Sequence, residues 1–437
     1  MKYIVIDAVM GTGKSTYITL KIKADPESRH IVVLPMLTEL KRYEKLLQDI
    51  EGLVSLYEGN SKKERFDEAL EHAPVILITH ALFEKHLNDE SFVQVQQGKW
   101  KLVMDEVVTA FETVGVTDVD ISGLCTLGAL TIKEMKPGVD LLQSDPLTFH
   151  SFRKADGNLA SNTHKALLKD ALVKDLYRVT ADRGSHYYTF SLQEQRLSVF
   201  EEVTILTYPF KDTDLDYWFQ IKGIEVEHLE LSRRVKTGSL SDFDLQPHSG
   251  HYSGNAFKDR IEFLEPPVVR GKTRYGHWNN HFSAESMRKN FKPRKKSQEG
   301  QIIVNELRTL FRNKRGRMVE PDDFMFTCLA DSMLAFRDSK NGLTKEFISD
   351  ETFVAFNKRA TNGYSHKHHL AYLYNVFPFP PIVKMIEAHG LKYNAERWAL
   401  YILIQWIWRS AIRNDEKIYL YLPSKRMRKI LEDWLNA

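Results

Sequence analysis

Residues 3–16 decide the fold, and they read Tyr-Ile-Val-Ile-Asp-Ala-Val-Met-Gly-Thr-Gly-Lys-Ser-Thr. The stretch from residue 3 to residue 9 is almost wholly apolar, which predicts a buried strand. Two glycines end this strand, and a helical pattern then runs from Lys14 to about Lys23. A strand, a glycine-rich turn and a helix in this order form the setting of a phosphate loop. Gly11 and Gly13 let backbone N–H groups face phosphate oxygens, and the helix N-terminus adds its dipole.

Lys14 and Ser15 carry the chemistry of this loop. A lysine at this point reaches the β- and γ-phosphates of a nucleotide, and the hydroxyl that follows it binds Mg²⁺. We therefore expect ATP and Mg²⁺ as cofactors, with the nucleotide held by Gly11, Thr12, Gly13, Lys14, Ser15 and Thr16. Ala8 replaces the usual first glycine of the motif. The alternative is a glycine-containing turn that binds nothing.

Two adjacent acids, Asp105 and Glu106, end a short apolar strand that begins at Lys101. The carboxyl ends of parallel strands lie at the sheet edge where a phosphate loop also lies. We expect Asp105 to hold Mg²⁺, directly or through water, and Glu106 to polarise the attacking water. Taken alone, this pattern is equally typical of a solvated strand end. A glutamate directly after the aspartate favours hydrolysis of the nucleotide over phosphate transfer to a small molecule.

Strands and helices alternate along the first part of the chain. Further strands are predicted at 31–34, 75–78 and 102–104, with a helix at about 38–48. This alternation predicts a parallel sheet covered on both faces. We expect residues 1–235 to form a first α/β domain that closes with a strand at 203–207. Residues 112–200 break the alternation and are interpreted as an insertion.

The remainder predicts a basic, loop-rich middle at 236–320 and a second α/β domain at 321–437. Residues 236–257 are rich in Gly, Ser, Asp and His, which is typical of loops. Residues 288–317 contain eleven Lys or Arg against two Glu. The second alternating pattern predicts strands at 324–329, 353–356 and 417–422, and helices at 395–412 and 424–435.

The composition of the 437-residue chain sets outer limits on its class. An apolar fraction of 43% is ordinary for a globular protein and supports more than one core. The chain has 61 Lys or Arg and 58 Asp or Glu, which excludes a histone-like protein but not a local basic track. Cys125 and Cys328 form no CxxC pair, and no run of 18 apolar residues exists. We therefore expect a cytoplasmic protein (of a host cell, if viral) without a membrane partner.

The loop and the acid pair, which two valines follow, resemble the first motif and the DExx box of superfamily 2 helicases. The likeness is greatest to the compact phage-encoded members of these DExx-box ATPases. It implies two RecA-like phosphate-loop domains that clamp a nucleotide in the cleft between them. It also implies that ATP hydrolysis moves the protein along a nucleic-acid strand.

Shorter stretches are similar to other motifs of the same family. Residues 33–40 and 77–80 are similar to two motifs that contact the nucleic-acid backbone, and residues 358–362 resemble the fifth motif. Residues 205–208 occupy the place of the third motif without its usual Ser/Thr-Ala-Thr. The resemblance implies nucleic-acid contacts by Pro35, Thr38, Thr79, His80 and Thr361.

Residues 405–413 resemble the sixth motif, Gln-x-x-Gly-Arg-x-x-Arg, although Trp408 stands where glycine is usual and the second arginine comes one residue late. Gln405, Arg409 and Arg413 are spaced i, i+4 and i+8, which predicts one face of a helix. This helix is apolar on most sides, and buried cations need an anionic partner. The resemblance implies that the γ-phosphate is this partner, with Arg409 as the arginine finger and Arg413 as its support. Ion pairs within the same domain are the alternative.

The basic stretch contains a helical pattern in which Arg308, Arg312 and Arg315 share one face. Such a face can neutralise phosphates without reading bases, although most charge runs are solvated helix faces. Tyr187, Tyr188 and Phe190 could stack on unpaired bases or belong to a hairpin core. No zinc site is expected at His366, His368 and His369, because no cysteine ligands lie nearby.

Together the motifs predict a nucleic-acid-dependent ATPase, a helicase or translocase that acts on single-stranded or branched DNA. RNA as a substrate and replication or recombination proteins as partners stay open. One alternative is a viral DNA-packaging ATPase with a nuclease, for which Asp322, Asp323 and Asp331 are the available carboxylates. A second is a binding protein that uses ATP only as a switch and has no need of Arg409 and Arg413.

Overall fold

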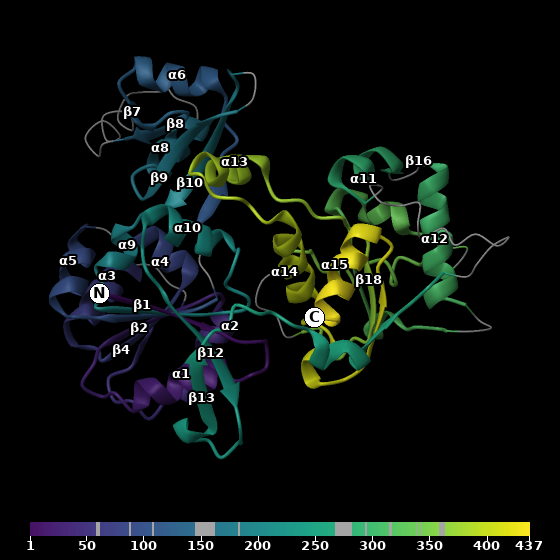
Figure 1. The fold of residues 1–437 in the computed structure, drawn as a ribbon, viewed down its shortest axis with the longest axis horizontal. Helices are drawn as coiled ribbons and strands as arrows, with labels where there is room; N and C mark the ends of the chain where they lie inside the picture. Colours follow the sequence, from purple (N-terminus) through teal and green to yellow (C-terminus); the bar gives the residue numbers. More distant parts are fainter. Residues whose placement is uncertain are drawn as a thin grey trace. The chain divides into compact units, whose positions relative to one another are not determined.

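The computed structural model of the chain consists of two compact units (Figure 1). Unit 1 is Met1–Gly250 with Phe379–Tyr393, and unit 2 is His251–Pro378 with Asn394–Ala437. The structure describes residues 1–57, 62–86, 89–106, 109–144, 162–181, 184–266, 282–292, 295–313, 317–338, 340, 342–357 and 363–437. Among these residues, no helix combines the length and the apolar character needed to cross a bilayer.

The main sheet of unit 1 has eight strands in the order β13-β12-β1-β11-β5-β2-β4-β3. All neighbours pair in parallel except β12 and β13, which are antiparallel. The strands are β1 (Lys2–Asp7), β2 (His30–Leu34), β3 (Val54–Ser55), β4 (Val75–Thr79), β5 (Lys101–Asp105), β11 (Glu202–Thr207), β12 (Glu227–Arg233) and β13 (Phe243–Pro247). β11 thus lies between the strand that leads into the phosphate loop and the strand that ends in the two acids.

The strands in the middle of this sheet are almost fully buried, as expected where helices cover both faces. The helices are α1 (Lys14–Lys23), α2 (Leu37–Leu46), α3 (Lys62–His72), α4 (His80–His86), α5 (Asp89–Gln97), α9 (Gln195–Ser198) and α10 (Asp214–Lys222). One core cluster joins the inner sides of α1 and α2 to β1, β2 and β4. The alternating α/β pattern of the sequence is therefore confirmed as an α/β unit with a largely parallel sheet.

The segment predicted as an insertion forms its own antiparallel sheet in the order β6-β10-β9-β8-β7. Its elements are β6 (Phe111–Thr113), α6 (Asp118–Thr126), β7 (Thr131–Lys136), β8 (Val139–Gln143), α8 (Asn162–Asp170), β9 (Lys174–Thr180) and β10 (His186–Leu192). Tyr188 and Phe190 are buried in the core between this sheet and α6 and α8. These two aromatic side chains belong to a hairpin core, the second of the two interpretations of the sequence.

Unit 2 is built on a parallel four-stranded sheet in the order β14-β19-β18-β17. Its strands are β14 (Ile261–Phe263), β17 (Phe324–Thr327), β18 (His369–Tyr372) and β19 (Ile418–Tyr421), with a separate small hairpin of β15 (Phe291–Lys292) and β16 (Lys295–Lys296). Its helices are α11 (Ala284–Asn290), α12 (Gln298–Phe311), α14 (Ala395–Ile407) and α15 (Lys425–Leu435).

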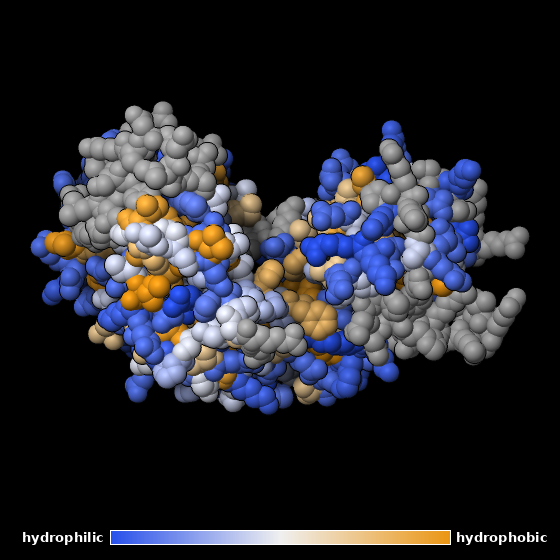
Figure 2. Space-filling model, turned by 90° about the horizontal axis from the view of Figure 1, so that it is seen from above, coloured by the Kyte–Doolittle hydropathy of each residue, from blue (hydrophilic) through white to orange (hydrophobic). Residues whose placement is uncertain are grey.

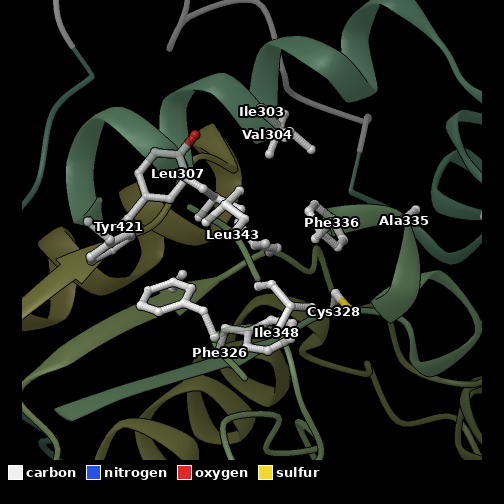
Figure 3. Packing of buried hydrophobic residues seen from close by; sticks show 14 of the residues in the cluster. Ile303, Val304, Leu307, Phe326, Cys328, Ala335, Phe336, Leu343, Ile348 and Tyr421 are labelled. Atoms are coloured by element: carbon white, nitrogen blue, oxygen red, sulfur yellow. The ribbon is translucent and has the colours of Figure 1, made fainter. Parts of the chain in front are cut away.

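One hydrophobic cluster fills the space between α12 and the sheet of unit 2 (Figure 3). Ile303, Val304 and Leu307 of α12 lie over Phe326 of β17 and Tyr421 of β19. The Tyr421 hydroxyl donates to Glu306 Oε2 at 2.5 Å, so this buried carboxylate has a partner. The helix in the basic stretch is thus a structural part of the second core.

The boundaries of the units differ from the predicted domains. Unit 1 continues past residue 235, because β13 pairs with β12 and extends the first sheet to Pro247. It also includes α13 (Pro380–Ala388), which packs on β9 and β10. β14 and α12 belong to unit 2, so the region 236–320 does not form a separate middle. At the predicted strand 353–356, the structure has only an isolated bridge from Phe353 to Phe326.

The helix predicted at 395–412 ends at Ile407, which corrects the expectation that Gln405, Arg409 and Arg413 share one helix face. Arg409 lies in the turn after the helix, and Arg413 lies in a short 3₁₀ helix, Ala411–Asn414. The chain turns here because the Ala411 amide donates to the Lys367 carbonyl just before β18, at 3.0 Å. This tertiary hydrogen bond replaces continuation of the α-helical ladder.

Candidate nucleotide-binding site

The segment predicted to be a phosphate loop leaves β1 at Asp7 and enters α1 at Lys14. Gly11 has φ 88° and Gly13 has φ 99°, in the region that side chains disfavour. A Cβ atom on Gly13 would also lie 3.2 Å from the Phe243 ring, so both the backbone conformation and the limited space favour glycine at this position. Thr12 Oγ1 donates to the Val9 carbonyl at 2.6 Å and closes the turn. The local sequence therefore forms the turn that a phosphate loop requires.

The ammonium group of Lys14 folds back over its own loop. Lys14 Nζ donates to the Ala8 carbonyl and, at 3.4 Å, to the Val9 carbonyl. The Lys14 cation and the N-terminus of α1 thus lie at the same end of the helix, where an anion is favoured. Thr16 lies in the first turn of α1, where its carbonyl accepts from Thr19 Oγ1.

Ser15 and Asp105 meet at the carboxyl edge of the sheet. Ser15 Oγ donates to Asp105 Oδ2 at 3.1 Å, although the two residues are 90 positions apart in sequence. Tyr43 of α2 donates its hydroxyl to the same Oδ2 at 2.7 Å. Burial, together with the nearby Asp105 carboxylate, raises the pKa of Tyr43 well above its ordinary value, so the phenol stays a donor. A hydroxyl and a carboxylate are hard oxygen ligands, which fit Mg²⁺.

Glu106 follows Asp105 but lies in a different environment. Its side chain is exposed and its φ is 67°, a left-handed conformation that is uncommon for a residue with a Cβ. The Glu106 amide donates to the Leu206 carbonyl of β11 at 3.0 Å, which holds the turn. The acid pair is therefore divided into a buried carboxylate that faces Ser15 and an exposed one beside it.

The residues of the two predicted nucleic-acid motifs in unit 1 end neighbouring strands. Leu34 of β2 pairs with Thr79 of β4, so Pro35 and Thr79 lie at the same sheet edge. Thr38 is exposed in the first turn of α2. His80, by contrast, is buried, and its Nε2 lies 3.2 Å from the backbone carbonyl of Asp105. This position links two strand ends and does not present the ring to a nucleic acid.

The sixth-motif residues in unit 2 differ in exposure. Gln405 and Arg413 are exposed, whereas Arg409 is 7% exposed. Burial raises the pKa of the nearby Tyr372, and the Arg409 guanidinium opposes this rise. Trp408, which stands where the family has glycine, packs edge-on against Phe257 with ring centroids 4.6 Å apart. The large ring at this position is thus part of the core. Thr361 and the rest of the fifth-motif stretch 358–362 lie outside the described residues.

The three arginines predicted to share a nucleic-acid-binding face do not have equal environments. Arg312 donates to the Val319 carbonyl at 2.6 Å and to the Gly342 carbonyl at 3.2 Å, and it lies over the Phe347 ring. Its guanidinium therefore joins the end of α12 to the segments around Val319 and Gly342 within unit 2. Arg308 is partly buried on α12, and Arg315 lies outside the described residues. Among the side chains that the structure describes in this region, the exposed cations are Arg288 and Lys289 of α11 and Lys292 of β15.

Sequence reasoning missed a cluster beside the loop, formed by Asp7, His228 and His248. Asp7 is 1% exposed, and its Oδ2 accepts from the Phe210 amide at 2.9 Å and lies 3.0 Å from His228 Nε2. One carboxylate or imidazole atom of each side chain lies within 4.8 Å of the others, a spacing at which three residues could bind a metal ion. However, the two imidazoles stack face to face, 4.2 Å apart and 6° from parallel. The lone pair of a ring nitrogen lies in the ring plane, so stacked rings do not direct both nitrogens at one ion. The cluster ties β1 to β12, β13 and the loop after β11.

The carboxylates offered for a nuclease do not gather into a metal site among the described residues. Asp323 accepts from His368 Nδ1 at 2.8 Å and from His369 Nδ1 at 2.7 Å, at the amino ends of β17 and β18. His368 Nε2 in turn lies 2.7 Å from Glu416 Oε2. This network joins the amino ends of β17, β18 and β19. Asp322 and Asp331 do not take part in it.

Two sequence comparisons relate the chain to a prophage protein. Residues 256–435 match the family described as the YonV C-terminal Rossmann-like domain. The chain is 27% identical over 443 aligned residues to the SPbeta prophage-derived uncharacterized protein YonV of Bacillus subtilis (strain 168), covering 99% of this chain and 98% of that protein.

Comparison with solved structures finds similarity to helicases at low identity. A structure named XPD_Helicase has a TM-score of 0.41 and 13% identity, covering 100% of this chain and 95% of that one. The S. tokodaii Xpd4 structure has a TM-score of 0.41 and 11% identity, covering 99% and 94%. The DUF1998 helicase MrfA, bound to DNA and AMPPNP, has a TM-score of 0.36 and 11% identity, covering 100% and 48%. The family that matches residues 256–435 is described as a Rossmann-like domain. This range begins close to His251, the first residue of unit 2.

Proposed function

We propose that this protein hydrolyses ATP with Mg²⁺ and couples the hydrolysis to movement on nucleic acid, as a helicase or translocase acting on DNA. The observation that supports this most is the meeting of Ser15 Oγ and Asp105 Oδ2, 3.1 Å apart, beside the glycine turn. The two groups come from different elements, and the fold brings them to the end of the loop that suits phosphates. A strand–helix turn without a nucleotide has no need of this arrangement.

The residues of the site have separate tasks in this proposal. Lys14 and the N–H groups at the start of α1 bind the phosphates. Ser15 and Asp105 would hold Mg²⁺, which neutralises charge on the phosphoryl group as it is transferred. Glu106 accepts the proton of the attacking water. The sixth-motif resemblance of unit 2 assigns Arg409 to the charge that develops in the transition state.

The nucleic-acid part of the proposal rests on two surfaces. Thr38 is exposed and Pro35 and Thr79 are partly exposed at the edge of the first sheet, next to the strand that ends in Asp105. Residues 288–317 carry a strong excess of positive charge, part of which lies exposed on α11. Such charges bind phosphates without reading base sequence.

The proposal is tested by the rate of ATP hydrolysis in the full chain, alone and with single-stranded DNA, duplex DNA, forked DNA or RNA. We expect stimulation by DNA. Lys14→Ala should abolish hydrolysis while the unfolding midpoint stays close to that of the wild type, because the Lys14 ammonium donates to two carbonyls of its own loop, those of Ala8 and Val9. Lys45→Ala removes an exposed lysine from α2 and is the matched control. Hydrolysis by Lys14→Ala at the wild-type rate would exclude this phosphate loop as the site.

A further inference from the structure

A cation of the protein itself lies at the predicted metal-binding pair. Arg42 of α2 donates from Nη2 to Ser15 Oγ at 3.0 Å, and the same nitrogen lies 3.8 Å from Asp105 Oδ2. The Arg42 guanidinium also bonds to Glu39 one turn earlier on the helix, with Nη2 2.6 Å from Glu39 Oε2. The Arg42 side chain is 42% exposed, so it has room to move.

The neighbouring residue on the helix has the opposite character. Tyr43 is fully buried, and its hydroxyl is 2.7 Å from Asp105 Oδ2. Two hydroxyls, those of Ser15 and Tyr43, donate to this carboxylate oxygen. Tyr43 is fixed by packing because it is fully buried, whereas Ser15 is partly buried. The Arg42 side chain is the most exposed of the groups around Asp105 and is therefore the exchangeable one.

We propose that Arg42 is a positioning residue that stands in for the metal ion. It neutralises Asp105 and orients Ser15 while Mg²⁺ is absent, and it yields this place to Mg²⁺ and keeps only its bond to Glu39 when the nucleotide binds. Two cations at one carboxylate oxygen repel each other, so Arg42 and Mg²⁺ compete for this place. Glu39 already bonds the guanidinium and retains it when Asp105 is taken by the ion. This inference rests on the proposed function, because it concerns the same metal-binding pair.

The competition is measured as the Mg²⁺ concentration that gives half-maximal binding of a fluorescent, non-hydrolysable ATP analogue to the full chain. Removing the competitor in Arg42→Ala should lower this concentration by about two- to fivefold, since exposed ion pairs are weak. Arg42→Lys keeps the charge and should restore much of the wild-type dependence. Lys41→Ala removes a cation from the next, exposed position of α2 and should leave the concentration unchanged.

Removing the alternative partner of Arg42 should act in the opposite direction. In Glu39→Gln the guanidinium loses its second carboxylate and stays at Ser15 and Asp105, so more Mg²⁺ is needed for half-maximal binding. Glu44→Gln neutralises another acid of the same helix and is the matched control. This variant keeps the proposal falsifiable if Arg42→Ala fails to fold.

The outcomes separate this inference from the proposed function. If the wild-type chain binds the analogue but Arg42→Ala or Glu39→Gln shows the Mg²⁺ dependence of its control, Arg42 does not stand in for the ion. If the wild-type chain binds no analogue at any Mg²⁺ concentration, the proposed function and this inference both fail. Opposite shifts in Arg42→Ala and Glu39→Gln, with both controls unchanged, would support the competition.

Discussion

The last residue of β5 and the acid that follows it show how adjacent residues come to lie in different environments. Asp105 is 9% exposed and receives hydroxyl donors from Ser15 and Tyr43, whereas Glu106 is exposed in a left-handed turn. The first suits the binding of a metal ion, and the second suits contact with a water molecule. The order Asp-Glu in the sequence predicts separate roles for the two acids, and these roles stay a prediction. The different burial of the two side chains and the donors around Asp105 are visible only in the structure.

The division of roles predicts different effects for two isosteric substitutions. Glu106→Gln should bind Mg²⁺ and nucleotide as the wild type does but hydrolyse ATP at least about 100-fold more slowly, because the amide does not accept the proton of water. Asp105→Asn should weaken Mg²⁺-dependent nucleotide binding itself. Nucleotide affinity at several Mg²⁺ concentrations and single-turnover hydrolysis check this. Equal losses of nucleotide affinity in both variants would contradict the assignment.

At the scale of elements, local patterns were predicted well where they carry their own signal. The strand–glycine–helix pattern of residues 3–23 and the helical pattern in the basic stretch correspond to elements of the structure. The end of α14 and the pairing of β13 with β12 depend on contacts between distant residues, as at Ala411 and Lys367. The environment of Arg312 also depends on distant residues. Its spacing on the helix does not predict that its guanidinium donates to the carbonyls of Val319 and Gly342.

β18 was not predicted from the sequence; it begins at His369, directly after His368. The structure explains these histidines by the network in which His368 lies between Asp323 and Glu416. Burial opposes the charge on this ring, but the hydrogen bonds to both carboxylates raise the pKa of His368 above its ordinary value of 6.5. Burial likewise opposes ionisation of Asp323, yet its hydrogen bonds from His368 and His369 lower the pKa of this carboxyl.

The raised pKa predicts a pH-dependent contribution of His368 to stability. A group with a raised pKa in the folded state stabilises fully below its unfolded pKa of about 6.5, and this contribution is lost as pH rises through the folded pKa. His368→Gln should therefore be more destabilising at pH 5.5 than at pH 8.5, by no more than about 1 kcal/mol since the ring is partly exposed.

Urea unfolding midpoints at both pH values measure this effect of His368→Gln. The control is His366→Gln, since His366 pairs with Asp322 at the surface, where side-chain exposure is 49% and 92%. This variant should show little change at either pH. Equal destabilisation by His368→Gln at pH 5.5 and pH 8.5 would show that the ring acts by packing alone.

At the scale of the whole molecule, charge is distributed locally and not as a general excess. The net charge is only +3, although residues 288–317 alone have eleven basic residues and two acidic ones. The face shown in Figure 2 is largely hydrophilic, with hydrophobic residues in small groups. A protein of this kind attracts polyanions through a particular surface and not through its overall charge.

The last prediction is therefore that nucleic acid binds to the exposed part of this basic segment, independently of base sequence and with a steep dependence on salt. Changing Arg288, Lys289 and Lys292 together to Gln should weaken DNA binding, because these cations are exposed whereas Arg312 is engaged inside unit 2. Each lost phosphate contact lowers the slope of log affinity against log salt by about 0.9 on duplex DNA. The triple variant should thus lose up to about 3 units of this slope.

Binding of unrelated fluorescent DNA sequences between about 50 and 200 mM salt measures this slope. The matched control changes three other exposed lysines of unit 2, Lys258, Lys340 and Lys345, to Gln. Because the phosphate loop belongs to unit 1, the affinity for an ATP analogue without DNA should stay unchanged in both triple variants, which separates loss of DNA binding from loss of the fold. An affinity for DNA that does not vary with salt would contradict the prediction. The same holds for equal losses in the two triple variants, because the contacts would then not lie on α11 and β15.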